Sequence, residues 1–201
     1  MNGTMTGMPL GLQEVVVAAG KRTGWIEVIC GSMFSGKTEE LIRRLRRAQI
    51  ANQKVEIIKP KLDVRYSNDH IVSHNQQKIS STAVEFAEEI LDIAKDCQVL
   101  GIDEAQFLKG DLVKVCKMLA KAGKRVVVAG LDKDYRGLPF DPIPQLLAEA
   151  EYITKAMAIC MQCGNPANYT QRISHSKELV LLGATDSYEA RCRACFEPPK
   201  E

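Results

Sequence analysis

The chain has 201 residues, of which 45% are apolar and 26% are charged, so it can bury a sizeable core and is not a disordered polyelectrolyte. Its formal net charge of +2 argues against a dedicated nucleic-acid binder, because such proteins carry a strongly basic face. No apolar run approaches the roughly 20 residues of a membrane-spanning helix, and residues 1–12 lack the pattern of a secretory signal. We therefore expect a cytoplasmic protein with no membrane partner.

The pattern of apolar residues predicts alternating strands and helices. Residues 1–23 show no long period and predict a flexible N-terminal extension. In chain order we then expect a strand over 25–30, a helix over 37–49, a strand over 55–58, a long loop with one short strand over 61–82, a helix over 83–94, a strand over 99–102, a helix over 112–122, a strand over 125–129, a helix over 143–150 and a strand over 152–158.

This alternation is typical of an α/β fold, in which helices cover a mainly parallel sheet. From residue 160 onward, short polar pieces with paired cysteines replace the pattern. We therefore expect a boundary near residue 158, which divides an α/β domain over 24–158 from a small domain over 159–201.

Residues 31–38 read GSMFSGKT and fit the phosphate-loop pattern G-x-x-x-x-G-K-[ST]. The glycines let the backbone curl so that its N–H groups point at phosphate oxygens, and the helix that follows adds the positive end of its dipole. Lys37 is expected to reach the β/γ-phosphates of a nucleotide, and Thr38 to place its hydroxyl on Mg²⁺. The alternative is a glycine-rich helix start. The expected phosphate-binding residues are Gly31, Ser32, Met33, Phe34, Ser35, Gly36, Lys37 and Thr38.

Two acids, Asp103 and Glu104, follow the apolar run 99–102. The carboxyl ends of parallel strands line the ligand crevice, so Asp103 can hold the Mg²⁺ shell. Glu104 can accept a proton from an attacking hydroxyl or water. An acid pair at a strand end is otherwise typical of a helix cap or a solvated turn, and the upstream phosphate loop favours the catalytic interpretation.

Two C-x-x-C pairs supply four thiolates, the ligand set of a closed tetrahedral Zn²⁺ site. Four sulfurs leave no coordination position for water, so the predicted role is structural, and a redox role is the alternative. The pairs consist of Cys160, Cys163, Cys192 and Cys195. The other cysteines lie on predicted strand or helix faces and are expected to be small buried residues: Cys30, Cys97 and Cys116.

These motifs, in this order, resemble one family: thymidine kinase of the cytosolic, zinc-containing type. The resemblance covers about residues 24–197, and its motifs are GSMFSGKT at 31–38, K-x-D-x-R-Y-S at 61–67, DEAQF at 103–107, GLD at 130–132, PF at 139–140 and D-x-Y at 186–188. It implies a P-loop NTPase-like (RecA-like) mainly parallel sheet flanked by helices, plus a small C-terminal zinc-binding domain with a lasso loop.

The resemblance implies transfer of the ATP γ-phosphoryl group to the 5′-hydroxyl of thymidine, and of deoxyuridine, in nucleotide salvage. Mg²⁺ would accompany ATP, and Zn²⁺ would be structural. Glu104 would be the general base, Asp63 would lie beside the Mg²⁺ with Thr38 and Asp103, and Arg65 would lie beside the transferred phosphate. The phosphate site would also include Asp103, Glu104, Ala105 and Gln106. A homotetramer, feedback inhibition by dTTP and the absence of a nucleic-acid partner are also implied.

The same resemblance implies a nucleoside pocket. Its walls would be Met33, Phe107, Leu131, Tyr135 and Phe140. A lasso loop anchored by zinc at both ends would hydrogen-bond the thymine through its backbone, and its residues are Leu179, Val180, Leu181, Leu182, Gly183 and Tyr188. For Phe107 and Phe140 the alternative is simple core packing.

Two other classes share some of these motifs. A zinc-ribbon ATPase acting on nucleic acid would also have a phosphate loop and four cysteines, and a non-catalytic nucleotide sensor would have the phosphate loop. Between the cysteine pairs, however, basic and acidic residues are equal in number. Four thiolates with one Zn²⁺ contribute a charge of about −2, which brings the formal total near zero. This balance favours a small-molecule kinase.

Overall fold

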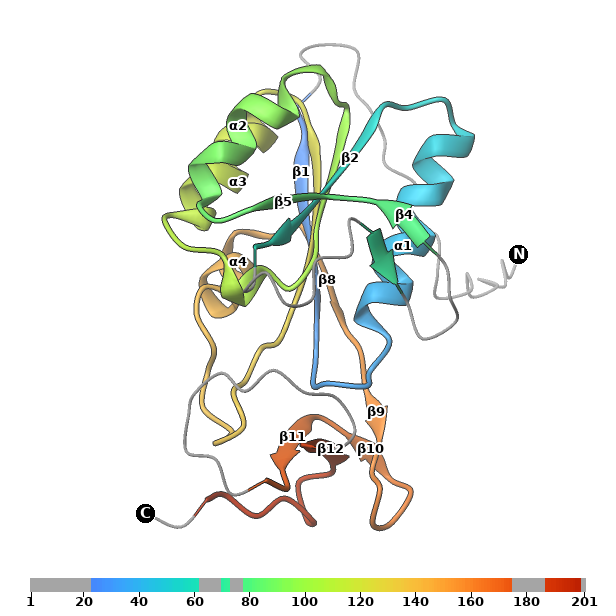
Figure 1. The fold of residues 1–201 in the computed structure, drawn as a ribbon, viewed down its shortest axis with the longest axis vertical. Coiled ribbons are helices and arrows are strands. Elements are labelled where there is room, and N and C mark those ends of the chain that lie inside the picture. Colours follow the sequence, from blue (N-terminus) through green and yellow to red (C-terminus); the bar gives the residue numbers. More distant parts are fainter. Residues whose placement is uncertain (1–22, 62–69, 73–77, 175–186, 200–201) are drawn as a thin grey trace, which may run out of the picture.

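The computed structural model describes residues 23–61, 70–72, 78–174 and 187–199. Within these ranges, six parallel strands form the main sheet, in the order β5-β2-β6-β7-β1-β8 (Figure 1). The strands are β1 (Trp25–Cys30), β2 (Val55–Pro60), β5 (Thr82–Val84), β6 (Val99–Ile102), β7 (Arg125–Gly130) and β8 (Tyr152–Lys155). The predicted parallel α/β sheet is thus confirmed, whereas the extension over residues 1–22 lies outside the described part of the chain.

Helices cover both faces of this sheet (Figure 1). On one face, α1 (Lys37–Ile50) buries Leu41, Ile42 and Leu45 against strand residues such as Val127. On the other face lie α2 (Ile90–Ile93), α3 (Leu112–Lys121) and α4 (Ile143–Glu149). Because β1, β6 and β7 are buried on both faces, their sequences are nearly continuous apolar runs. None of the helices described is both long and apolar enough to cross a membrane.

The region between β2 and β6 differs from the sequence prediction. The expected helix over 83–94 is wrong at its start, because Thr82–Val84 forms β5, which pairs with β2 and buries Val84 at the sheet edge. Helical structure begins only at Ala87, as one α-turn (α2) between two 3-10 turns. The predicted loop over 61–82 also contains more than one strand, since β3 (His70–Val72) pairs antiparallel with β4 (Lys78–Ser80).

A small group of strands follows the main sheet. The expected strand over 152–158 is wrong at its end: β8 stops at Lys155, and the next strand, β9 (Ala158–Ile159), pairs with β10 (Pro166–Ala167) instead. Ala158 packs in a separate apolar cluster with Cys160 and Ala167, which explains why the chain leaves the main sheet here. A second hairpin joins β11 (Tyr169–Arg172) to β12 (Tyr188–Arg191). We call residues 158–174 and 187–199 the cysteine module; Figure 1 shows it beyond the end of the main sheet where β9–β12 are drawn.

The close packing of α1 on β6 predicts how substitutions at this contact change the free energy of unfolding. A Cβ added at Gly101 would lie 2.4 Å from Cδ1 of the fully buried Leu45. Gly101→Ala should therefore lower the free energy of unfolding by about 1–3 kcal/mol, and Leu45→Ala should lower it by about 2–5 kcal/mol. The double variant should lose less than the sum, because the missing leucine carbons make room for the new methyl group. Urea unfolding measures all three, and strictly additive losses would contradict this packing.

Candidate functional site

The phosphate loop connects the end of β1 to the start of α1. Gly31 has φ 145°, and a Cβ there would lie 2.2 Å from the carbonyl oxygen of Ala156, so only glycine fits. Gly36, in a left-handed conformation with φ 80°, immediately precedes α1. The loop therefore curls back onto the helix N-terminus, the arrangement that presents backbone N–H groups to an anion.

Lys37, the first residue of α1, turns its ammonium group into the loop. Its Nζ is buried and donates a hydrogen bond to the Ser32 carbonyl oxygen at 2.7 Å. Burial lowers the pKa of Lys37, and the charges of Glu104, Asp103 and then Asp132 oppose that effect. The buried ammonium can bind an anionic ligand such as a phosphate. The nearby carboxylates favour a ligand that carries a cation, because the cation would neutralise their charge.

Asp103 directly follows β6, and its side chain hydrogen-bonds the residue after Lys37. The Thr38 hydroxyl donates to its Oδ2 at 3.1 Å, and its Oδ1 accepts the backbone N–H of Glu104 at 3.0 Å. Burial raises the pKa of Asp103 to about 7, with a further contribution from the charge of Glu104, while Thr38 and Lys37 act in the opposite direction. A hydroxyl and a buried carboxylate at this position fit the oxygen ligands that Mg²⁺ takes beside nucleotide phosphates.

Glu104 and Gln106 begin the turn after β6. Glu104 has φ 49°, a left-handed conformation that is strained for a residue with a side chain. The amide Nε2 of Gln106 donates to Glu104 Oε2 at 2.6 Å, and Oε1 of Gln106 accepts the backbone N–H of Leu131 at 2.9 Å. The carboxylate expected to act as a base is therefore held between the ends of β6 and β7.

Two of the predicted nucleoside-pocket aromatics contact each other. The rings of Phe107 and Phe140 meet edge to face, with centroids 5.9 Å apart, and both are half-buried. Tyr135 and Tyr188 are joined through a residue that the sequence did not single out: the Arg172 guanidinium lies 3.6 Å from the Tyr135 ring centroid and donates to the Tyr188 hydroxyl at 2.5 Å. Arg172 lies in a polar stretch without periodicity, so no sequence signal identified it.

Asp132, two residues beyond β7, is a further acid that sequence reasoning did not assign a role. Its Oδ2 pairs with Lys155 Nζ at 2.7 Å, and its buried Oδ1 has no hydrogen-bond partner among the described residues. Because β1 lies between β7 and β8, this ion pair crosses the end of β1, where the phosphate loop begins. An acid just after an apolar strand is the same signal that identified Asp103, and it could have found Asp132.

The cysteine module contacts the phosphate loop directly. The backbone N–H of Met33 donates to the hydroxyl of the buried Thr170 at 3.0 Å, and the Ser32 hydroxyl donates to the Ala167 carbonyl oxygen at 3.5 Å. Phe34, another left-handed residue with φ 65°, packs against the apolar cluster of the module. The conformation of the phosphate loop therefore depends on the module as well as on the main sheet.

The four predicted zinc ligands converge. The sulfur atoms of Cys160, Cys163, Cys192 and Cys195 all lie within 4.8 Å of one another. A tetrahedral Zn²⁺ with Zn–S bonds of about 2.3 Å needs sulfurs about 3.8 Å apart, so this cluster is compatible with a structural zinc. The remaining cysteines Cys30, Cys97 and Cys116 are buried in the main core, as predicted.

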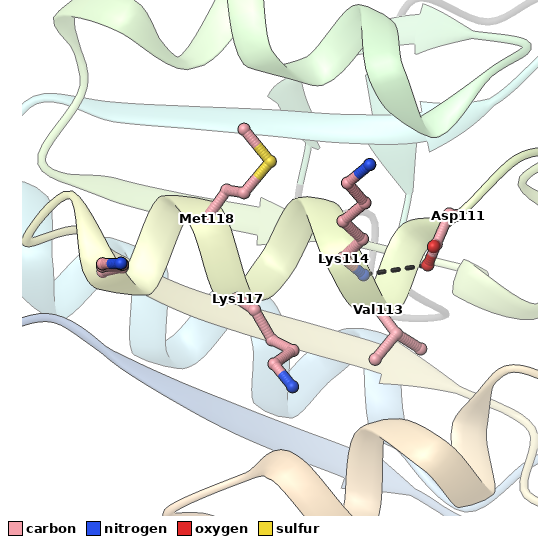
Figure 2. Close-up of a pocket in the computed structure, with 6 residues that line it drawn as sticks. Asp111, Val113, Lys114, Lys117 and Met118 are labelled. Carbon is pink, nitrogen blue, oxygen red and sulfur yellow. Dashed lines mark hydrogen bonds between the residues drawn. The ribbon is translucent and has the colours of Figure 1, made fainter.

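Some of the expected site residues cannot be placed. Asp63, Arg65 and the lasso residues 179–183 lie outside the described residues. A separate shallow cavity of about 420 Å³ lies on the outer side of α3, lined by Lys114, Lys117 and Met118 among others (Figure 2). It contains no residue of the phosphate loop or of the strand ends, so it is distinct from the candidate active site.

A glycine-bounded loop that wraps a buried lysine at the carboxyl edge of a parallel sheet defines the class of P-loop nucleotide-binding proteins. Comparison with known proteins narrows this class. The family model for thymidine kinase matches residues 24–196. A curated thymidine kinase from Rhodothermus sp. (strain ITI 518) is 57% identical over 189 residues, which is 94% of this chain and 89% of that relative.

The chain therefore belongs to the thymidine kinase family, and it is a kinase that phosphorylates thymidine. Among solved structures, AMPPCP-bound DnaA from Aquifex aeolicus aligns with a TM-score of 0.40 and 15% identity, covering 67% of this chain and 40% of that chain. A likeness at that level supports no further conclusion.

The raised pKa of Asp103 predicts a pH-dependent stability. Between its ordinary pKa of 3.8 and about 7, the folded chain keeps a proton that the unfolded chain has lost, so stability falls as pH rises. In magnesium-free buffer at about pH 8, Asp103→Asn should be more stable than the native chain by about 1–4 kcal/mol, because an amide cannot ionise. The gain should shrink as the pH is lowered to about 5. Urea unfolding across this range measures it, and a gain independent of pH would contradict the burial argument.

The cysteine cluster predicts one bound zinc per chain. Cys192→Ser should weaken zinc binding by on the order of 100-fold, because one of four ligands is lost, and should raise the KM for thymidine. Cys97→Ser is the matched control. The Cys97 thiol is buried in the core of the main sheet, outside the four-cysteine cluster, and it donates to the Ala94 carbonyl oxygen. Metal content by mass spectrometry and competition with a chromogenic chelator measure the effect. Equal zinc binding by both variants would contradict the assignment.

Proposed function

We propose that this chain transfers the γ-phosphoryl group of ATP to the 5′-hydroxyl of thymidine, giving dTMP and ADP, with the phosphate loop as the ATP site and Glu104 as the general base. The observation that carries this proposal is the hydrogen bond between Thr38 and Asp103 at 3.1 Å. It joins the acidic end of β6 to the phosphate loop, so that a nucleotide held by the loop would have Glu104 beside its terminal phosphate.

Each residue of the site then has its own role in the reaction. Loop amides and the Lys37 ammonium bind the β/γ-phosphates and stabilise the charge of the transferring group. The 5′-oxygen attacks the γ-phosphorus while the bond to the ADP oxygen breaks, and Glu104 takes the hydroxyl proton. Thr38 and Asp103 would hold the Mg²⁺, which when bound would neutralise part of the phosphate charge. Asp63 and Arg65 belong to this proposal by resemblance.

The nucleoside pocket is proposed on the side of Glu104 where the aromatic residues gather. Two sets of side-chain contacts support it, because they bring separated parts of the sequence together. They are the contact between Phe107 and Phe140 and the contacts of Arg172 with Tyr135 and Tyr188. Met33 and Leu131 complete the proposed walls, and backbone groups of residues 179–183 are proposed to hydrogen-bond the base. Backbone recognition of this kind would also accept deoxyuridine.

Regulation and assembly are proposed on family resemblance. The kinase would act in nucleotide salvage in the cytoplasm, as a homotetramer, without a nucleic-acid partner. dTTP, the end product of the route that dTMP enters, would inhibit it.

The base assignment predicts a separable loss of chemistry. Glu104→Gln should lower kcat by at least about 100-fold, because the amide cannot accept the hydroxyl proton. ADP affinity should stay within about twofold of the native value, since the phosphate loop is unchanged. Glu85→Gln, at an exposed acid that pairs with Lys109, is the matched control and should keep full activity. Near-normal turnover of Glu104→Gln would refute the assignment.

A further inference from the structure

Gln106 is a buried amide with both of its polar ends engaged. It is 7% exposed, it accepts the backbone N–H of Leu131 through Oε1 at 2.9 Å, and it donates through Nε2 to Glu104 Oε2 at 2.6 Å. Leu131 directly follows β7, and Glu104 lies just after β6. The side chain thus connects the ends of two adjacent strands across the candidate active site.

The backbone fixes which way round this amide lies. The Leu131 N–H can only donate, so the oxygen of Gln106 must face it, and the NH₂ group must face Glu104. An NH₂ group can only donate, so the partner atom on Glu104 must be an acceptor. The short contact of 2.6 Å fits a hydrogen bond to an ionised carboxylate.

The surrounding backbone leaves room for this side chain. A Cβ at Gly130 would lie 2.8 Å from Gln106 Oε1, so a larger residue there would displace the amide. Glu104 itself is held in a left-handed conformation, with its N–H bound by Asp103 Oδ1. Its other carboxylate oxygen, Oε1, makes no hydrogen bond to any residue that the structure describes. One oxygen is therefore anchored, and the other is left for a substrate.

We propose that Gln106 is a positioning residue: it anchors Oε2 of Glu104 so that Oε1 faces the 5′-hydroxyl, and it ties that geometry to Leu131 at the edge of the nucleoside pocket. This role rests on the proposed function, because it takes Glu104 to be the base. It is a different role from the phosphate contact that the sequence suggested for Gln106, because it uses the amide oxygen and one N–H, which already bind protein atoms.

The test begins with two single variants of the full-length protein. Gln106→Met keeps the length of the side chain but removes both hydrogen bonds. Gln106→Glu keeps an acceptor for the Leu131 N–H, but it replaces the donor to Glu104 with a carboxylate oxygen that also adds a negative charge there. Both should lower kcat by about 10- to 100-fold, the scale of a misplaced catalytic group. The KM for ATP, the KM for thymidine and the affinity for ADP should each change by less than about twofold. A rise in the KM for ATP with unchanged kcat would overturn the proposal in favour of a phosphate ligand.

A double-variant cycle separates positioning from a general structural role. In a Glu104→Gln background, where no base is left to position, Gln106→Met should lower the residual single-turnover rate by less than about twofold. Losses that multiply would overturn the positioning role while leaving the base assignment intact. Near-normal kcat in Glu104→Gln alone would instead overturn the base assignment. The melting temperature of each variant, and native-like ADP binding, establish that the folded protein is being compared.

Discussion

The ammonium group of Lys37, buried where neighbouring parallel strands end, is the constraint on which the rest of the site depends. A buried charge is costly unless partners compensate for it, and here the carboxylates of Asp103, Glu104 and Asp132 act on it from the ends of β6 and β7. The sheet order places β7 next to β1 and β6 next to β7, so the residues that follow these parallel strands lie at the same edge of the sheet as the phosphate loop. The sheet therefore brings together the charged side chains that compensate one another in the site.

The cysteine module also holds the phosphate loop in place. Thr170 and Ala167 bind the loop residues Met33 and Ser32, and Phe34 packs into the apolar cluster that includes Cys160 and Cys192. A structural metal in this module would thus support the phosphate loop as well as the nucleoside side of the site. The Asp132–Lys155 pair adds a third support, because it crosses the end of β1, where the phosphate loop begins. Phosphoryl transfer depends chiefly on positioning, and supports of this kind supply it.

Much of this could be predicted from the sequence because the signals are local. Buried parallel strands read as continuous apolar runs, and the GKT loop and the cysteine pairs each lie within a few residues. What was missed depends on distant contacts. β5 is three residues long and is extended only because β2 pairs with it, so its sequence resembled the start of the following helix. The link between Asp132 and Lys155 requires knowing that β1 lies between their strands. Arg172 joins two tyrosines that are far apart in the chain.

The most direct test of the proposed reaction is the identity of the products formed from Mg-ATP and thymidine, followed by phosphorus NMR. We expect ADP and thymidine 5′-monophosphate in equal amounts, with little inorganic phosphate and no effect of added DNA or RNA. ADP with inorganic phosphate in place of the monophosphate, formed faster when nucleic acid is added, would contradict it and would indicate a nucleic-acid-dependent ATPase.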